Sequence, residues 1–239
     1  WTGLAFGLYL CRDAFAGDQW RDWGRVFDRA RLKRMMQVNG DIMVRSVLLT
    51  GSFTTFLFIG SGVGDVNLAA NQILLQFVEI TAFALDGFAF SAEALVGGAV
   101  GAKARARVRR ASIITSQWGV GGSVLLGIAF AAGGPWLIDL MSTSPEVREA
   151  GRVFLIWAVV MPALSVASYM FDGIYIGATW TRDMRWAMIQ SVAAYVIALL
   201  VLVPAFGNHG LWAALMVLNL ARGVTLGLRY PRLEAQIGA

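Results

Sequence analysis

Four polar side chains recur every seven residues through one of the most apolar stretches of the chain: Gln72, Glu79, Asp86 and Glu93. A straight helix drifts only about 20° per seven residues, so this acidic stripe would follow one helix face. Carboxylates inside a membrane are rare, costly and usually functional. Burial favours the neutral form of a carboxyl group, which can then bind and release a proton near neutral pH. Within a membrane, the stripe would therefore indicate proton- or cation-coupled transport.

Other polar groups share the predicted spans with the stripe. Acids that faced lipid would be intolerable, so we expect them to face the bundle interior or a water-filled cavity. The residues predicted to couple ions or line such a cavity are Asp86, Asp172, Glu79, Gln72, Gln76 and Asn71.

The alternative is that each acid only forms a structural ion pair. Glu93 is nearest the predicted cytoplasmic end, where Lys103 or Arg105 could pair with it. Asp41 could meet Arg45 one helical turn later. We favour this structural interpretation for Glu93 and Asp41, and a functional one for Asp86 and Asp172; for Glu79 the two are evenly balanced.

Composition places the chain in a membrane. Apolar residues make up 57% of it and charged residues only 15%, whereas a typical soluble domain is about 45–50% apolar and about 25% charged. Many apolar runs approach or exceed the roughly 20 residues that cross about 30 Å of hydrocarbon. We therefore predict an all-α integral membrane protein with a bundle of six transmembrane helices. The predicted spans are 42–62, 67–100, 112–133, 152–177, 187–205 and 210–228.

Four segments follow from these spans. Residues 1–11 are expected to be the cut end of another transmembrane helix, since the chain starts without Met inside an apolar run. Residues 12–41 place aromatic side chains at helical spacing among charges, which favours an amphipathic linker on the membrane surface over a solvated loop. Residues 42–228 would form the bundle, and residues 229–239 a cytoplasmic tail.

Basic residues gather at one end of the predicted spans. Sixteen of the twenty lysines and arginines lie there, and only Arg148 and Arg152 lie beyond the other end. Because basic loops remain in the cytoplasm, we expect the linker and the C-terminus to be cytoplasmic. The net charge of +5 is then a topology signal and requires no nucleic-acid partner.

Catalytic and cofactor motifs are largely absent from the sequence. The single Cys11 excludes an internal disulfide and a CxxC metal site, and His209 has no second histidine with which to share a metal. The sequence has no P-loop for ATP and no G-x-S-x-G motif. We predict that the protein is not an enzyme and has no metal site or cofactor apart from a coupling ion, H+ or Na+.

Several segments together carry a family pattern. Leu85–Gly97 has the sequence LDGFAFSAEALVG, and Phe171–Thr179 has FDGIYIGAT. Ala69–Phe77, Gly207–Trp212 and Leu220–Gly227 follow the same pattern. Taken in their order along the chain, and across nearly the whole of it, these segments resemble the multidrug and toxic compound extrusion (MATE) family, specifically its DinF-like branch.

The resemblance implies two pseudo-symmetric six-helix bundles around a central cavity. This chain would be the C-terminal half, and its partners would be the lipid bilayer and a missing N-terminal six-helix lobe. In the DinF-like branch the main proton-coupling carboxylate lies in that missing lobe. Asp172 is the position that would correspond to a cation-binding carboxylate of a sister branch. The glutamate that the sister branch uses on the first helix of this bundle has no clear counterpart, which argues against a complete Na+ site.

The resemblance also implies a function. The leading hypothesis is multidrug efflux across a bacterial cytoplasmic (inner) membrane, with small cationic or amphipathic compounds exported by alternating access in antiport with H+ or Na+. A lipid-linked precursor or polysaccharide flippase of the same superfamily would favour a larger, more basic cavity. A non-transporting membrane scaffold subunit would require local pairs that neutralise all the acids. An intramembrane enzyme would require a nucleophile–base pair or a metal cluster.

Overall fold

The computed structural model describes residues 2–12, 24 and 27–237, and these contain α-helices and short connections but no β-strand. The chain divides between Gly40 and Asp41 into two compact units. The first unit contains α1, Thr2–Leu10, which is a short apolar helix without buried residues. Most of the predicted amphipathic linker, including Trp20 and Trp23, lies outside the described residues.

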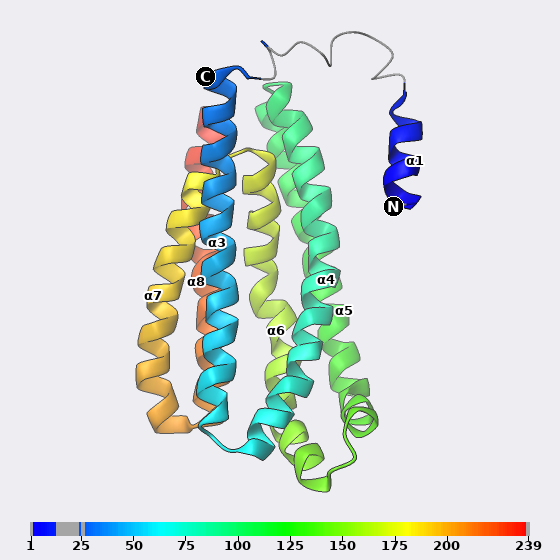
Figure 1. The fold of residues 1–239 in the computed structure, drawn as a ribbon, viewed down its shortest axis with the longest axis vertical. Coiled ribbons are helices and arrows are strands. Elements are labelled where there is room, and N and C mark those ends of the chain that lie inside the picture. Colours follow the sequence, from blue (N-terminus) through cyan, green and yellow to red (C-terminus); the bar gives the residue numbers. More distant parts are fainter. Residues whose placement is uncertain (1, 13–23, 25–26, 238–239) are drawn as a thin grey trace. The chain divides into compact units, whose positions relative to one another are not determined.

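Six helices are long and apolar enough to cross a membrane, as the sequence predicted (Figure 1). Together with the absence of strands from the described residues, they confirm the all-α, six-span fold class. The helices are α3 (Arg29–Ser61), α4 (Asp65–Gly101), α5 (Arg105–Met141), α6 (Pro145–Gly177), α7 (Thr181–Phe206) and α8 (Asn208–Gln236).

The helices extend beyond the predicted spans. α4 and α5 have 37 residues each, which corresponds to about 55 Å at 1.5 Å per residue, against about 30 Å of hydrocarbon. Hydropathy marks only the part of a helix that suits lipid, whereas the basic first turns of α5 continue the same helix because no glycine or proline interrupts them. Similarly, α3 is helical from Arg29, well before the predicted start at residue 42.

Short connections reverse the direction of the chain between consecutive helices. At one end of the bundle the α4–α5 and α6–α7 connections each contain one left-handed residue, Lys103 with φ 52° and Thr179 with φ 58°. At the other end a glycine takes this role before α4 and before α8, at Gly64 and Gly207. Left-handed residues terminate helices abruptly, so all four connections stay tight.

Glycines bring α6 against α4. A Cβ atom on Gly173 would lie 2.2 Å from the carbonyl oxygen of Ala89, and one on Gly177 would lie 2.5 Å from that of Glu93. The two glycines form a GxxxG motif, which allows helix backbones in membranes to approach closely. This approach places Asp172, the residue before Gly173, beside the acidic stripe of α4.

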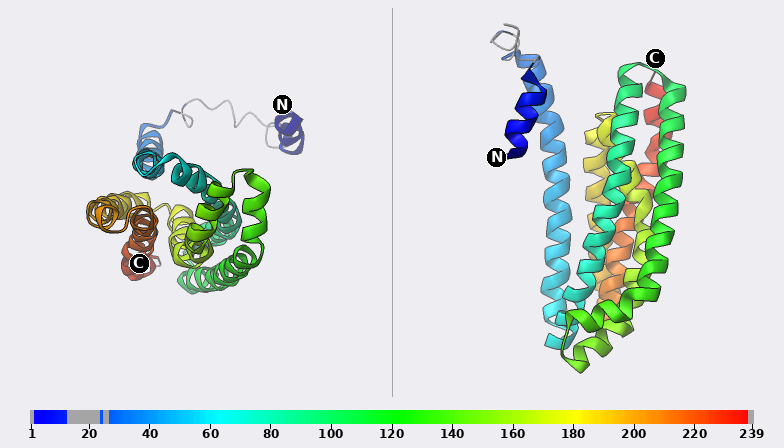
Figure 2. Two further views of the ribbon diagram at one scale, coloured as in Figure 1. Left: turned by 90° about the horizontal axis from the view of Figure 1, so that it is seen from below. Right: turned by 90° about the vertical axis from the view of Figure 1, so that its right-hand side faces the viewer.

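From Asp41 onward, α3 is held differently from the other helices. The backbone of α4 packs closely on α5 and α6, that of α6 on α5 and α8, and that of α8 on α7, whereas that of α3 makes few close approaches (Figure 2). Side chains bridge the distance: the Tyr195 hydroxyl donates to the carbonyl of Ser52 at 3.1 Å, and the ring of Phe56 packs edge-on against Trp212. The space left between α3 and the bundle contains the site.

Candidate functional site

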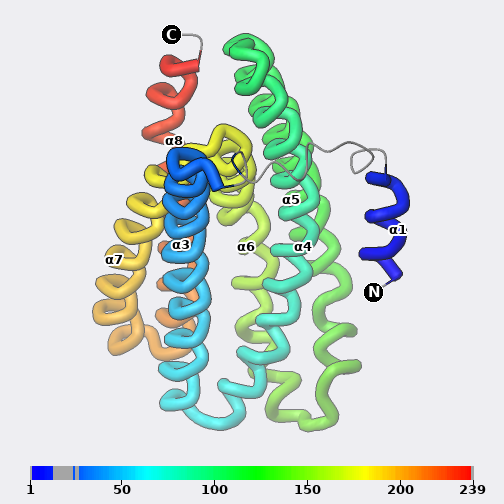
Figure 3. The backbone as a smooth tube through the Cα atoms, turned by 45° about the horizontal axis from the view of Figure 1, so that its top comes forward, coloured from blue at the N-terminus to red at the C-terminus, as the bar shows by residue number. Residues whose placement is uncertain are grey.

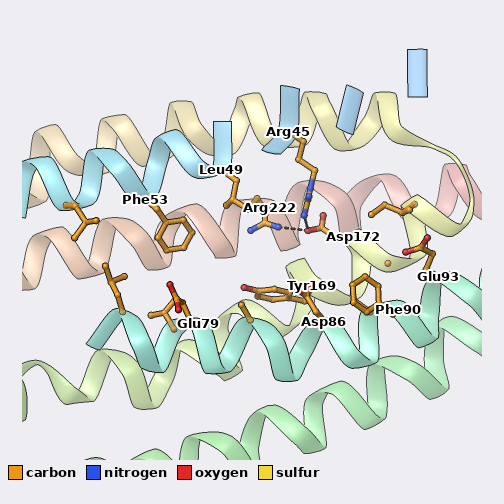
Figure 4. A pocket seen from close by; sticks show the side chains of 17 residues that line it. Arg45, Leu49, Phe53, Glu79, Asp86, Phe90, Glu93, Tyr169, Asp172 and Arg222 are labelled. Carbon is orange, nitrogen blue, oxygen red and sulfur yellow. Dashed lines mark hydrogen bonds and ion pairs between the residues drawn. The ribbon is translucent and has the colours of Figure 1, made fainter. Parts of the chain in front are cut away.

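A cavity of about 490 Å³ lies between α3, α4, α6 and α8 (Figure 4). Its walls combine aliphatic and aromatic side chains with a small number of charged ones, a pattern typical of ligand sites. The charged and tyrosine side chains that line it are Arg45, Glu79, Asp86, Glu93, Tyr169, Asp172 and Arg222.

The acidic stripe contributes three of its four members to this cavity. Glu79, Asp86 and Glu93 all line it, at successive heights along α4 (Figure 4). The outer two are 14 residues apart, or about 21 Å along the helix axis. The seven-residue spacing therefore identified a continuous cavity-facing edge of α4.

Two arginines clamp Asp172 at the centre of the cavity. Arg45 of α3 and Arg222 of α8 both donate a hydrogen bond to the same carboxylate oxygen, Oδ2 (Figure 4). Asp172 and Arg222 are buried, with 5% and 3% of their surfaces exposed. The guanidinium of Arg222 also donates to Asn219 at 3.3 Å. Buried charges require such partners, because an unpaired one is strongly destabilising.

The clamp leaves the other carboxylates of the cavity without an ion pair to any described residue. No hydrogen bond or salt bridge joins a described residue to the side chain of Glu79, Asp86 or Glu93. Asp86 lies beside Tyr169, on the wall opposite the clamp (Figure 4). Four acids against two arginines give the lining a formal charge of −2. The cavity can therefore accept protons or an organic cation, with Asp86 closest to the clamp.

Asn71 lies in a separate buried cluster. Its amide exchanges two hydrogen bonds with that of Asn208, at 2.7 and 3.0 Å, and its oxygen accepts a third from the indole of Trp212 at 2.8 Å. Gln72 and Gln76 are exposed on the isolated bundle. None of these three predicted residues is among those that line the cavity.

Two predicted ion pairs are wrong. Glu93 lines the cavity, whereas Arg105 pairs with Glu234 at 3.4 Å. The chain reverses direction at Lys103, between α4 and α5, and Arg105 at the start of α5 then meets Glu234 of α8.

Asp41 does not pair with Arg45 either. Its carboxylate accepts hydrogen bonds from Arg185 and, at 3.2 Å, from Thr181, both on α7. Arg45 instead reaches the buried Asp172 on α6, while Asp41, which is also buried, is paired from α7. Each buried charge thus has its partner on another helix.

The sequence analysis missed the role of the two clamp arginines. Spacing along one helix predicts Asp41 as the partner of Arg45 and gives no partner for Arg222. An arginine at membrane depth requires a partner, and Asp172 is the one acid on the later spans that lies within an apolar stretch. That requirement was the available signal. Among the described residues, no group of three or more His, Cys, Asp or Glu side chains could hold a metal ion.

Comparison with known proteins gives a consistent family. The MatE family model matches residues 42–203. The DNA damage-inducible protein F of Escherichia coli K12 is 34% identical over 212 residues, which is 85% of this chain and 44% of that protein. The chain thus spans less than half the length of this curated relative.

Solved structures show the same fold at lower identity. The Vibrio cholerae MATE transporter VcmN, in its bent form, superposes with a TM-score of 0.84 at 18% identity, over 97% of this chain and 53% of that one. A MOP superfamily transporter from Pyrococcus furiosus, described as having a binding pocket of reverse polarity, superposes with a TM-score of 0.67 at 16% identity, over 83% of this chain and 44% of that one.

Proposed function

Because this chain belongs to the MatE family of transporters, we propose that it forms one lobe of a secondary transporter that exports organic compounds in exchange for protons. One observation carries the proposal: Asp86, a carboxyl group without an ion pair to any described residue, lies across a cavity from an aspartate whose charge is already neutralised by two arginines. Transporters of this kind need no ATP site and are not enzymes.

The clamp favours H+ over Na+ as the coupling ion. A hard metal cation requires several free oxygen ligands, but Oδ2 of Asp172 already accepts hydrogen bonds from Arg45 and Arg222. The two positive charges beside Asp172 would repel a third. A proton needs only one carboxylate oxygen, which Asp86 supplies.

Competition for Asp86 would couple the two fluxes. When Asp86 is ionised, the acidic cavity attracts a small cationic or amphipathic compound, with apolar contacts from residues such as Phe53 and Phe90. When a proton neutralises Asp86, that attraction weakens and the compound leaves. One site that holds either a proton or the substrate gives antiport by alternating access.

We infer that the end of the bundle with the α4–α5 connection faces the cytoplasm. That connection and the first turns of α5 carry five basic residues, and basic loops remain inside. At the opposite end, Arg148 and Arg152 both pair with Asp139, at 3.9 and 2.6 Å.

The remaining face of the cavity would meet a second six-helix lobe, the N-terminal one, which this chain lacks. Carboxylates cannot face lipid, so some other protein surface must cover the side on which α3 stands apart. The two lobes would rock around the cavity in the inner membrane. One charge moving across 100 mV supplies about 2.3 kcal/mol, which sustains roughly a 50-fold substrate gradient.

The flippase and scaffold alternatives each predict a different site. A flippase for anionic lipid-linked precursors would need a cavity with net positive charge, whereas this one has two more acids than arginines. A scaffold subunit would have every acid paired, whereas three cavity acids have no ion pair to a described residue. The acidic, partly unpaired lining favours export of cationic compounds.

Replacing Asp86 with asparagine tests the proposal. We expect Asp86→Asn in the complete protein, reconstituted in liposomes, to lower pH-driven export of a fluorescent organic cation to background while folding stays intact. The measurement is dye movement after a pH jump, with and without Na+. Asp65→Asn is the matched control, because Asp65 is an exposed acid on the same helix and does not line the cavity. Unchanged export in Asp86→Asn, or export that requires Na+, contradicts the proposal.

A further inference from the structure

A second hollow, of about 710 Å³, lies on the opposite side of α6 from the cavity. The cavity is lined by Tyr169, Asp172, Gly173 and Ile176 of α6, and the second hollow by Phe171 and Ile174. At 3.6 residues per turn, the mean directions of these two sets are about 180° apart. We call the second hollow the α5–α8 groove, because these helices form its two walls. Both pack on α6 but barely on each other (Figure 3).

One end of the groove has hydrogen-bond donors suited to an anionic headgroup. The guanidinium of Arg109 lines it and has no ion pair to a described residue. Beside it, the buried hydroxyl of Tyr230 forms no hydrogen bond of standard geometry with a described residue, and the nearby hydroxyl of Ser112 donates its own proton to the carbonyl of Val108 at 2.9 Å. A buried hydroxyl without a partner is costly, and a ligand oxygen would satisfy it.

The one acid of the groove does not oppose an anion there. Glu234 lines the same end, but Arg105 pairs with it at 3.4 Å. With that charge compensated, Arg109 gives this end of the groove an uncompensated positive charge. A phosphate group is the anion whose oxygens could accept from both a guanidinium and a hydroxyl.

The rest of the groove suits an acyl chain. Its lining on α5 runs from Arg109 to Val120, which is about 16 Å along the axis and close to half of the roughly 30 Å hydrocarbon core. Ile113 and Val120 on α5 and the ring of Phe171 on α6 supply apolar surface along it, and Ser116 and Gln117 are the polar residues of this stretch. The groove therefore has the length of one membrane leaflet, with its charged end at the basic end of the bundle.

The inference that the groove faces lipid rests on the proposed function. If the second lobe covers the acidic cavity, the opposite face of α6 is turned away from that lobe and toward lipid. The basic residues around the α4–α5 connection would also attract anionic lipid to this end.

From this geometry we propose that the α5–α8 groove binds one anionic phospholipid of the cytoplasmic leaflet. Its phosphate accepts hydrogen bonds from Arg109 and Tyr230, and one acyl chain lies along the groove over Phe171. The bound lipid fills the space where α5 and α8 do not pack on each other.

The test is lipid retention by the complete protein. Wild-type and variant proteins are placed in bilayer discs of phosphatidylcholine, with or without phosphatidylglycerol, and lipids that remain bound after release are counted by native mass spectrometry. We expect wild type to retain one phosphatidylglycerol. Because hydrogen bonds to charged groups are the strong ones, Arg109→Gln should weaken retention about tenfold. Tyr230→Phe, which keeps the ring and its packing, should weaken it severalfold.

Arg110→Gln is the matched control, because it removes the same charge from the next position of α5, which does not line the groove. Arg110→Gln should retain lipid as wild type does. Equal losses in Arg109→Gln and Arg110→Gln, or equal retention of phosphatidylcholine, overturn the proposal. The proposal also fails if Arg109→Gln retains lipid as wild type does but loses dye binding, because the groove would then be a substrate path. Lipid counting requires no transport, so failure of the exporter proposal would be seen separately.

Discussion

Within the described part of the chain, two buried polar clusters anchor α8, one charged and one neutral. The charged cluster joins Arg222 of α8 to Asp172 and Arg45. The neutral one joins Asn208 and Trp212 of α8 to Asn71 of α4. Arg222 and Trp212 are ten residues apart, or about 15 Å along the helix. Both clusters contain buried polar side chains, which are costly unless they have partners.

The two clusters differ in whether they line the cavity and in whether acids without ion pairs lie beside them. In the neutral cluster each amide hydrogen-bonds the other, and Asn71 does not line the cavity. The charged cluster lines a cavity that also holds three acids without ion pairs among the described residues. A polar residue in a membrane span therefore indicates function only when it remains accessible and can still change its partner.

Removing the centre of the charged cluster should have the largest effect on stability. Asp172→Ala removes the carboxylate that the buried Arg222 and the partly buried Arg45 share, so we expect the complete protein to lose about 3–5 kcal/mol of unfolding free energy. Thermal unfolding in detergent measures the change.

Asp139→Ala is a matched control for this prediction. Asp139 also pairs with two arginines, Arg148 and Arg152, but on an exposed surface, so its loss should cost less than about 1 kcal/mol. Equal shifts in the two variants would mean that the clamp is as weak as a surface pair.

Removing the centre of the neutral cluster should have the next largest effect. Asn71→Ala leaves the amide of Asn208 and the indole N–H of Trp212 unsatisfied, at about 1–3 kcal/mol for each group. Export per folded molecule should stay at the wild-type level. The control is Asn67→Ala, which loses one bond to the local carbonyl of Val63. Lost export at unchanged stability would place Asn71 in the coupling machinery.

The sequence predicted the fold better than the site, for a physical reason. Hydropathy and basic-residue asymmetry depend on local composition, so six spans and the family pattern could be predicted directly. The GxxxG motif formed by Gly173 and Gly177 can likewise be recognised from a single helix, and the close approach that it allows is present in the fold.

The site depends on which helix each side chain faces, and spacing along one helix cannot decide that. Periodicity correctly grouped Glu79, Asp86 and Glu93, which share one face of α4. It could not pair Arg45 with Asp172, 127 residues apart, nor show that Asn71 bonds Asn208 instead of facing the cavity. Both clusters join residues that are distant in sequence, so only the packing of the helices reveals them.

Replacing Asp86 should lower stability less than replacing Asp172 or Asn71, the centres of the two clusters. Asp86→Asn removes no ion pair or hydrogen bond with a described residue, so we expect a stability change below about 1 kcal/mol, despite the loss of export predicted above. Thermal unfolding beside the transport assay separates the two effects. A large loss of stability would show that Asp86 belongs to the clamp and is not free to exchange a proton.

The smallest effect should come from Gln72, the fourth member of the stripe. It shares the face of Glu79, since seven residues drift by only about 20°, but it lies one turn beyond Leu75, where the cavity lining on α4 ends. Its side chain is exposed and forms no hydrogen bond to a described residue. Gln72→Ala should therefore change stability by less than about 0.5 kcal/mol and leave dye export unaltered in the same liposome assay. If export falls while stability holds, the substrate path of the complete transporter continues past Leu75, and the stripe is functional along its whole length.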